Sequence, residues 1–173
     1  PRPPARKDTP MKVTRIRALR GPNLWSRHTA LEAIITCTQA ECAIDALPGF
    51  EPRVRSLFPA IGALRPGGYV GPVSLAHVLE SAALALQAQA GCPVTFSHTA
   101  ATLEDGVYQT VVEYSEEAVG RLALELAQAL IHAALHETGF DMDAAIAQLR
   151  DLDEDERIGP STGAIVDAAV ARG

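Results

Sequence analysis

Aromatic side chains are scarce in this sequence: they make up 5% of its 173 residues, with a single tryptophan. A core of stacked rings is therefore excluded, and the abundant aliphatic residues predict helices packed on a sheet. Basic residues are also few, with 15 Lys and Arg against 21 Asp and Glu, for a formal net charge of −6. General nucleic-acid binding is not expected, because it needs a positively charged face.

The sequence also lacks a CxxC motif, a zinc-finger spacing and an apolar leader. Three cysteines without such partners predict reduced thiols in a cytoplasmic protein. Residues 1–10 are rich in proline and charge where a signal peptide needs an apolar segment, so we expect a disordered arm there. Residues 81–103 carry no formal charge, but they contain Gln, Gly, Pro and His, and we expect no membrane span.

The hydrophobic pattern divides residues 11–158 into strands and helices. β-rich runs predict strands at 11–20, 31–38, 93–96 and 106–114. Helical spacing predicts helices at 51–58, 74–89 (N-capped by Ser74 and stopped by Gly91), 116–136 (ended by Gly139) and 141–152. This order predicts the α+β class in two layers: a mainly antiparallel four-stranded sheet with helices packed on one face.

The end of the sequence has a different pattern. Residues 151–157 form an acidic stretch, and residues 159–173 have the Ala-rich periodicity of a capped amphipathic helix. A helix that stops at its last turn has little to dock on. We therefore expect 11–158 to form the domain and 159–173 to form a connecting helix towards something larger.

Two pairs of residues, each with at least one histidine, have a spacing that could place both side chains at a metal site. His77 and Glu80 form an HxxE motif on one face of the helix at 74–89, where they can bind a metal, place a base beside one, or form a solvated pair. His132 and His136 lie four residues apart and leave a similar choice. They either share a metal with a third ligand or interact with the helix dipole near its end.

Several short strings, in order along residues 11–173, together resemble the N-terminal domain of cyanophycin synthetases, the ligases that build an aspartate-arginine polymer. The strings are LRGPNLWS at 19–26, HVLE at 77–80, LALQ at 84–87, GVY at 106–108, EY at 113–114, EE at 116–117, GR at 120–121 and GPST at 159–162.

The resemblance implies that the whole protein continues into an ATP-grasp domain and a Mur-ligase-like domain, which use ATP and Mg. In the family these domains activate the polymer's backbone carboxylate and the aspartate side-chain carboxylate as acyl phosphates, adding Asp and then Arg. The N-terminal domain helps to hold the growing polymer. We therefore expect this chain to be an accessory domain that positions cyanophycin in a homo-oligomeric ligase, without catalysis of its own.

Some family members also resemble metallopeptidases through an HxxEH motif on this helix. There two histidines bind zinc, the glutamate activates water, and a later carboxylate completes the ligand set. Here His77 and Glu80 match, and Glu116 or Glu117 can supply the distal carboxylate, but Ser81 stands in place of the second histidine. A hydroxyl is a poor zinc ligand, so we predict a degenerate zinc site of His77 and Glu117, with Glu80 as its remnant catalytic group.

The polymer presents guanidinium groups and free carboxylates, so a surface with both signs of charge suits it. Such a surface is predicted where the first strand places three arginines near later carboxylates: Arg15, Arg17 and Arg20 near Glu113, Glu116 and Glu117. The alternative is that these are ordinary surface charges.

Two other functions stay open on the sequence. One is an active, primer-generating metallohydrolase that recruits an unusual ligand such as His98 or His132. The other is a structural or oligomerisation module that docks through the apolar positions of the helix at 163–171. Bound zinc with chelator-sensitive cleavage of cyanophycin would separate the first from a binding domain.

Overall fold

The computed structural model describes residues 11–20, 29–65 and 69–159. The arm expected at 1–10 and nearly all of the connecting helix expected at 159–173 lie outside the described residues.

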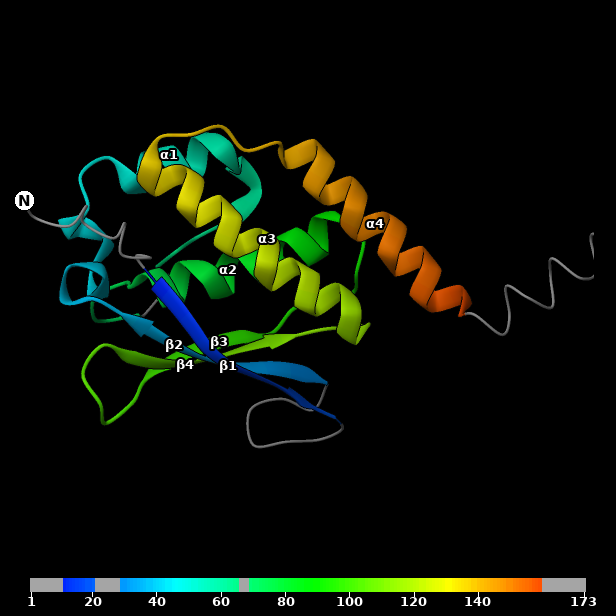
Figure 1. Cartoon of the computed structure of the whole chain (residues 1–173), viewed down its shortest axis with the longest axis horizontal. Coiled ribbons are helices and arrows are strands. Elements are labelled where there is room, and N and C mark those ends of the chain that lie inside the picture. Colours follow the sequence, from blue (N-terminus) through cyan, green and yellow to red (C-terminus); the bar gives the residue numbers. More distant parts are fainter. Residues whose placement is uncertain (1–10, 21–28, 66–68, 160–173) are drawn as a thin grey trace, which may run out of the picture.

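The sheet has the order β1-β2-β4-β3, and every neighbouring pair is antiparallel (Figure 1). Its strands are β1 (Met11–Leu19), β2 (Ala30–Cys37), β3 (Ser97–Ala101) and β4 (Val107–Glu113). The helices are α1 (Phe50–Leu57), α2 (Leu75–Gln89), α3 (Glu117–His136) and α4 (Met142–Ile158), with short 3-10 turns η1 (Gln39–Cys42), η2 (Ile44–Ala46) and η3 (Pro59–Ile61).

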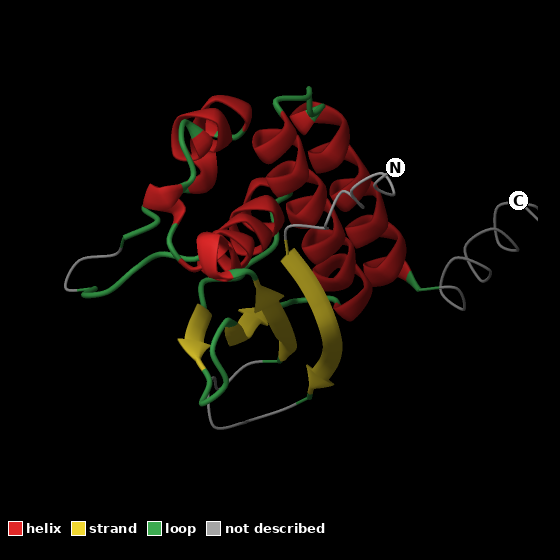
Figure 2. Ribbon diagram, turned by 60° about the vertical axis from the view of Figure 1, so that its left-hand side comes forward, coloured by secondary structure: helices red, strands yellow, loops and turns green. Residues whose placement is uncertain are grey.

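The helices all lie on one side of the sheet (Figure 2). Alternation along the strands explains this, because β2 turns Leu31, Ala33 and Ile35 into the core beneath the helices. The helix layer adds aliphatic residues to the same core, among them Leu79 of α2 and Leu124 of α3. The predicted α+β class is confirmed.

Helix α3 is the one helix in the described part of the chain that is long and apolar enough to cross a membrane by length and composition. It packs on α2 and the sheet, with Ala123, Ala127 and Ile131 fully buried. Its apolar face therefore belongs to the domain core.

The strand predicted at 93–96 was wrong. Those residues form a loop, and the edge strand β3 begins at Ser97. The polar run at 97–101 has no apolar alternation, because the side chains that it turns toward the helices include Ser97 and Thr99, which bind a carboxylate on α2.

Three details of the helices and strands differ from the sequence prediction. A β-bulge between Val13 and Arg15 places Val13 against the core with Ile16, whereas strict alternation along 11–20 would place it on the face of Arg15 and Arg17. Helix α3 ends at His136 as predicted, but the residue that stops it is Glu137, which takes a left-handed conformation at φ 55°, and not Gly139. Helix α4 continues to Ile158 through the acidic stretch.

Candidate functional site

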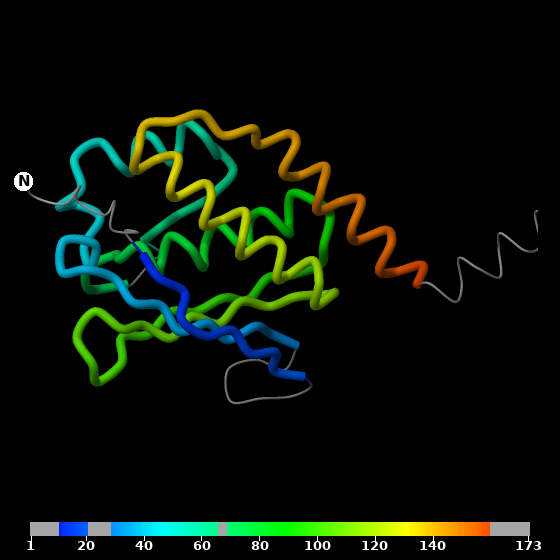
Figure 3. The backbone as a smooth tube through the Cα atoms, viewed as in Figure 1, coloured from blue at the N-terminus to red at the C-terminus, as the bar shows by residue number. Residues whose placement is uncertain are grey.

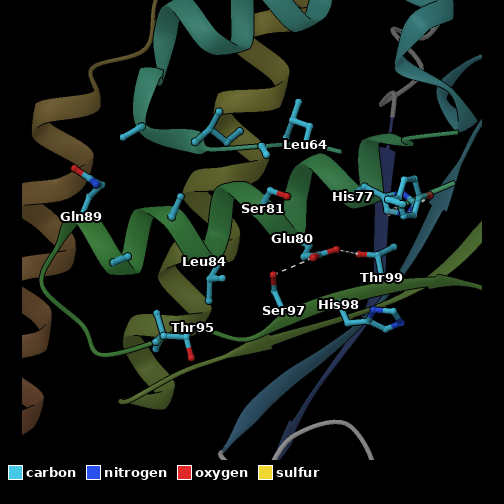
Figure 4. A pocket seen from close by; sticks show the side chains of 17 residues that line it. Leu64, His77, Glu80, Ser81, Leu84, Gln89, Thr95, Ser97, His98 and Thr99 are labelled. Carbon is cyan, nitrogen blue, oxygen red and sulfur yellow. Dashed lines mark hydrogen bonds between the residues drawn. The ribbon is translucent and has the colours of Figure 1, made fainter. Parts of the chain in front are cut away.

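A groove of about 450 Å³ opens between α2, β3, residues 60–64 at η3 and Tyr69 (Figure 4). His77, Glu80 and Ser81 line its α2 side, as the spacing of the motif predicts for one helix face. Ser97, His98 and Thr99 line its β3 side. No lysine or arginine lines the groove within the described residues, and Glu80 is its one carboxylate.

Glu80 is held in the groove by two hydroxyl groups of the edge strand. Ser97 donates a hydrogen bond to Oε1 at 2.9 Å, and Thr99 donates one to Oε2 (Figure 4). Thr99 is supported in turn by the hydroxyl of Thr110 on β4, 3.0 Å away. Burial raises the pKa of Glu80, and the hydrogen bonds from Thr99 and Ser97 and the nearby His98 oppose that shift. The carboxylate is thus oriented and poorly hydrated.

His77 has hydrogen-bond partners at both ring nitrogens. The backbone N–H of Ser74, the N-cap of α2, donates to Nδ1 at 3.1 Å. The hydroxyl of Tyr69 donates to the carbonyl of Pro72 at 2.8 Å, so its oxygen is left to accept from Nε2 at 3.1 Å. This pattern assigns the neutral tautomer with the proton on Nε2.

The same surroundings disfavour the charged form of the imidazole. Burial lowers the pKa of His77, and the nearby His98 lowers it further. The ring also contacts Tyr108 edge-on, with ring centroids 5.8 Å apart. His77 therefore acts as part of the helix cap and of the groove wall.

Glu117 lies far from His77. The histidine packs on Tyr108 near the start of β4, whereas Glu117 opens α3 after β4 has ended. A strand of 7 residues such as β4 spans about 20 Å, and the chain follows that length along the sheet before turning into α3 (Figure 3). The structure therefore does not bring the two predicted ligands together.

Glu117 instead belongs to a surface ion-pair network. It accepts from Arg20 at 3.3 Å and lies 3.6 Å from Arg121. Arg17 pairs at 3.1 Å with Glu32 on β2, a partner that the sequence analysis missed. Cross-strand register explains that pair, because Arg17 and Glu32 are direct neighbours in the β1-β2 ladder.

The other predicted arginine contacts have a different outcome. Arg15 is exposed and has no ion pair with another described residue. Glu113 is buried and accepts from the backbone N–H of Thr95 at 2.8 Å. Of the three carboxylates expected near the arginines, Glu117 is the one with an ion pair to a described arginine of the predicted set, Arg20, which follows β1.

Residues 32–136 match the family described as the cyanophycin synthase-like N-terminal domain. The chain belongs to this family.

Relatives of known name agree with this assignment. Cyanophycin synthetases from Trichormus variabilis, a Synechocystis species and Geminocystis herdmanii are 35%, 32% and 31% identical to the chain. Each comparison covers 94% of this chain and 20% of the relative. The chain thus spans a fifth of the length of the synthetases that it matches.

The zinc that an HxxEH motif would hold in this family does not fit the residues of this chain. Such a site needs three protein ligands, and in the described ranges no three His, Cys, Asp or Glu side chains gather closely enough to hold a metal. Both nitrogens of His77 are engaged, position 81 offers a hydroxyl, and Glu117 lies at the other end of β4.

His77, Glu80 and Ser81 were predicted from the sequence, but the partners of Glu80 on β3 were not. Ser97 and Thr99 alternate along the chain, which is the signal of a strand with one polar face. Their role was hidden because an interaction with Glu80 across 17 or 19 residues leaves no trace in local spacing.

Proposed function

We propose that this family member is a binding domain that holds the aspartate-arginine polymer while other domains of a larger ATP-dependent ligase extend it. Its membership of the cyanophycin synthetase N-terminal family supports the proposal at the level of the polymer. The observation that carries it for this chain is Glu80, an oriented carboxylate in a groove that no described lysine or arginine lines.

The chemistry of the groove suits an arginine side chain. A guanidinium group forms paired, charge-assisted hydrogen bonds with a carboxylate, and it is more weakly hydrated than an ammonium group. Its aliphatic stem packs on apolar surface, which the groove offers at Leu64, Leu84 and Ala85. A bound guanidinium would also offset the unfavourable burial of the Glu80 charge.

The arginines on and directly after β1 are the second proposed contact, for the carboxylates of the polymer. This role is proposed for Arg15, Arg17 and Arg20. Glu32 and Glu117 pair with two of them, so the surface carries charges of both signs. β1 and β3 are opposite edges of the sheet, so the two contacts can be tested separately.

Hydrolysis is the weaker alternative for this chain. Two features favour a binding role: Ser81 supplies no imidazole, and His77 holds the cap of α2 together with Tyr69. On this proposal the chain itself binds no metal, and ATP and Mg belong to the ligase domains of the larger protein. A homo-oligomeric ligase stays a prediction.

The test is titration calorimetry of the 173-residue chain with soluble Asp-Arg segments of defined length. Glu80→Gln keeps the shape of the side chain and removes its charge, and we expect binding about tenfold weaker or worse. Glu125→Gln makes the same change of net charge at an exposed position of α3 and should bind like the wild type.

The β1 contact has its own pair of variants. Arg15→Gln should weaken binding about threefold, as expected for an exposed charge, and Arg15→Lys should restore most of it. Absence of any binding by the wild type would overturn the proposal. Equal binding by the wild type and Glu80→Gln would show that the groove is not part of the proposed polymer-binding surface.

A further inference from the structure

Strand β3 has one row of backbone groups that form no hydrogen bond with another described residue. In an antiparallel ladder, residues alternate between those that bond to the neighbouring strand and those whose N–H and C=O point away from it. Two hydrogen bonds show which residues on this side of the sheet face β4. The backbone N–H of Glu113 donates to the carbonyl of Phe96, and the backbone N–H of Thr102 donates to the carbonyl of Val107. His98 and Ala100 therefore point their backbone groups toward β4.

The intervening residues are Ser97, Thr99 and Ala101, and their N–H and C=O groups point to the outer edge of the sheet. β3 is the last strand in the order, and none of these backbone groups bonds to another described residue. Such a row is a template for an extended peptide.

This free edge runs beside the groove. The side chains of Ser97 and Thr99 face the helix layer, where both reach Glu80 on α2 (Figure 4). A strand added outside β3 would therefore turn every second side chain toward the groove and Glu80. The intervening side chains would point to the open face of the sheet.

We propose that the peptide backbone of the Asp-Arg polymer pairs with the outer edge of β3 as a fifth strand and places alternate arginine-bearing side chains in the groove. This inference rests on the proposed function and adds to it the mode of recognition.

Periodicity and charge both favour this occupant. The outward groups of β3 recur every second residue, about 6.6 Å apart, and the backbone of an extended aspartate chain repeats at the same interval. Each aspartate of the polymer carries an arginine, so every side chain that enters the groove brings a cation to Glu80. An unrelated extended peptide would pair with the edge but would rarely supply that cation.

Backbone pairing can be detected directly by hydrogen exchange of the 173-residue chain with and without a soluble Asp-Arg segment. We expect slower exchange at the amides of Ser97, Thr99 and Ala101 when the segment is bound. The amides of His98 and Ala100 are internal controls, because they already donate to β4 and should not change.

A pair of variants at Ala101 tests the same contact through affinity. Ala101→Pro removes an outward donor without removing a bond to β4, and proline is tolerated on such an edge. We expect binding about threefold to tenfold weaker. Ala101→Val keeps the N–H and suits a strand, so it should bind like the wild type. Melting curves of both variants check that the fold is retained.

The outcomes separate this inference from the proposed function. If the wild type binds no segment, the proposed function itself fails. If it binds and depends on Glu80, while the β3 amides stay unprotected and the two Ala101 variants bind equally, strand pairing alone is overturned. Protection that rises with protein concentration without polymer would also overturn it, because a second copy of the chain would then occupy the edge.

Discussion

Nε2 of His77 lies 3.1 Å from the hydroxyl oxygen of Tyr69, and that hydroxyl donates onward to the carbonyl of Pro72. The nitrogen that a zinc ion would need is therefore used to connect the first turn of α2 to Tyr69, another residue that lines the groove. His77 thus occupies a ligand position of the HxxEH motif, but its hydrogen bonds hold the start of α2.

Zinc content follows from this arrangement. The wild-type chain, purified without chelator, should contain far less than one zinc ion, and added zinc should not produce cleavage of cyanophycin. Elemental analysis and a cleavage assay check both points. Stoichiometric zinc with chelator-sensitive cleavage would contradict the binding role and restore the primer-generating hydrolase.

Restoring the missing ligand gives a sharper comparison. Ser81→His alone should gain little zinc, because Nε2 of His77 is still bonded to Tyr69. Combining it with Tyr69→Phe frees that nitrogen and should raise zinc occupancy above either single variant. Equal occupancy in the single and double variants would show that Tyr69 does not compete with the metal.

The pKa of His77 predicts acid sensitivity. Burial and the nearby His98 lower this pKa in the folded state, so below about pH 6.5 the unfolded chain binds a proton that the folded chain resists. The free energy of unfolding should therefore fall as the pH drops from about 7 to 5.

His77→Gln isolates this contribution. The variant lacks the titrating imidazole, so its urea midpoint should fall less than that of the wild type between the same two pH values. Parallel pH profiles for the two proteins would mean that His77 takes up a proton as readily in the folded chain as in the unfolded chain.

The sequence was sufficient for the four helices, apart from the length of α4, and for the strands β1, β2 and β4, because their apolar residues mark an element of regular period. It was insufficient for β3, whose inward side chains are hydroxyls satisfied by Glu80. Local pattern also placed Val13 on the wrong face, since a bulge is decided by pairing with β2.

The candidate site was likewise predicted only in part. Spacing on one helix placed His77, Glu80 and Ser81 together correctly, because helix geometry is fixed. The expected ligand Glu117 depended on how far β4 carries the chain before α3 begins, and motif spacing contains no such information. Arg17 found Glu32 through strand register, which was likewise invisible in the sequence.

Glu80 should bind polymer at a cost to stability. Burial raises the pKa of Glu80, so its contribution to stability grows as the pH falls through the folded-state pKa and is unfavourable at neutral pH. Glu80→Gln should therefore unfold at the same or a higher temperature than the wild type at pH 7, although it binds polymer less well. A clear loss of melting temperature would mean that the hydrogen bonds from Ser97 and Thr99 outweigh the burial of charge.

Gly120 controls how closely α3 approaches the sheet. A Cβ at this position would lie 2.8 Å from Cβ of Tyr114 and 3.2 Å from Cδ1 of Leu31. Alanine gains about 1 kcal/mol over glycine in a helix interior, but forcing an extra methyl into a packed contact costs about 1–3 kcal/mol. The Cβ of Tyr114 is fixed to its backbone and cannot move aside as the end of a flexible side chain would.

We therefore expect Gly120→Ala to lower the free energy of unfolding by about 1 kcal/mol, measured by urea denaturation. The matched control is Gly139→Ala, where a Cβ would meet no atom within 4 Å; its effect should stay within about 0.5 kcal/mol. If Gly120→Ala were instead the more stable protein, helix propensity would outweigh the contact, and α3 would have to be free to move away from Leu31. Because α3 also packs along α2, such a movement should disturb the groove, and polymer affinity measured on the same variant would reveal it.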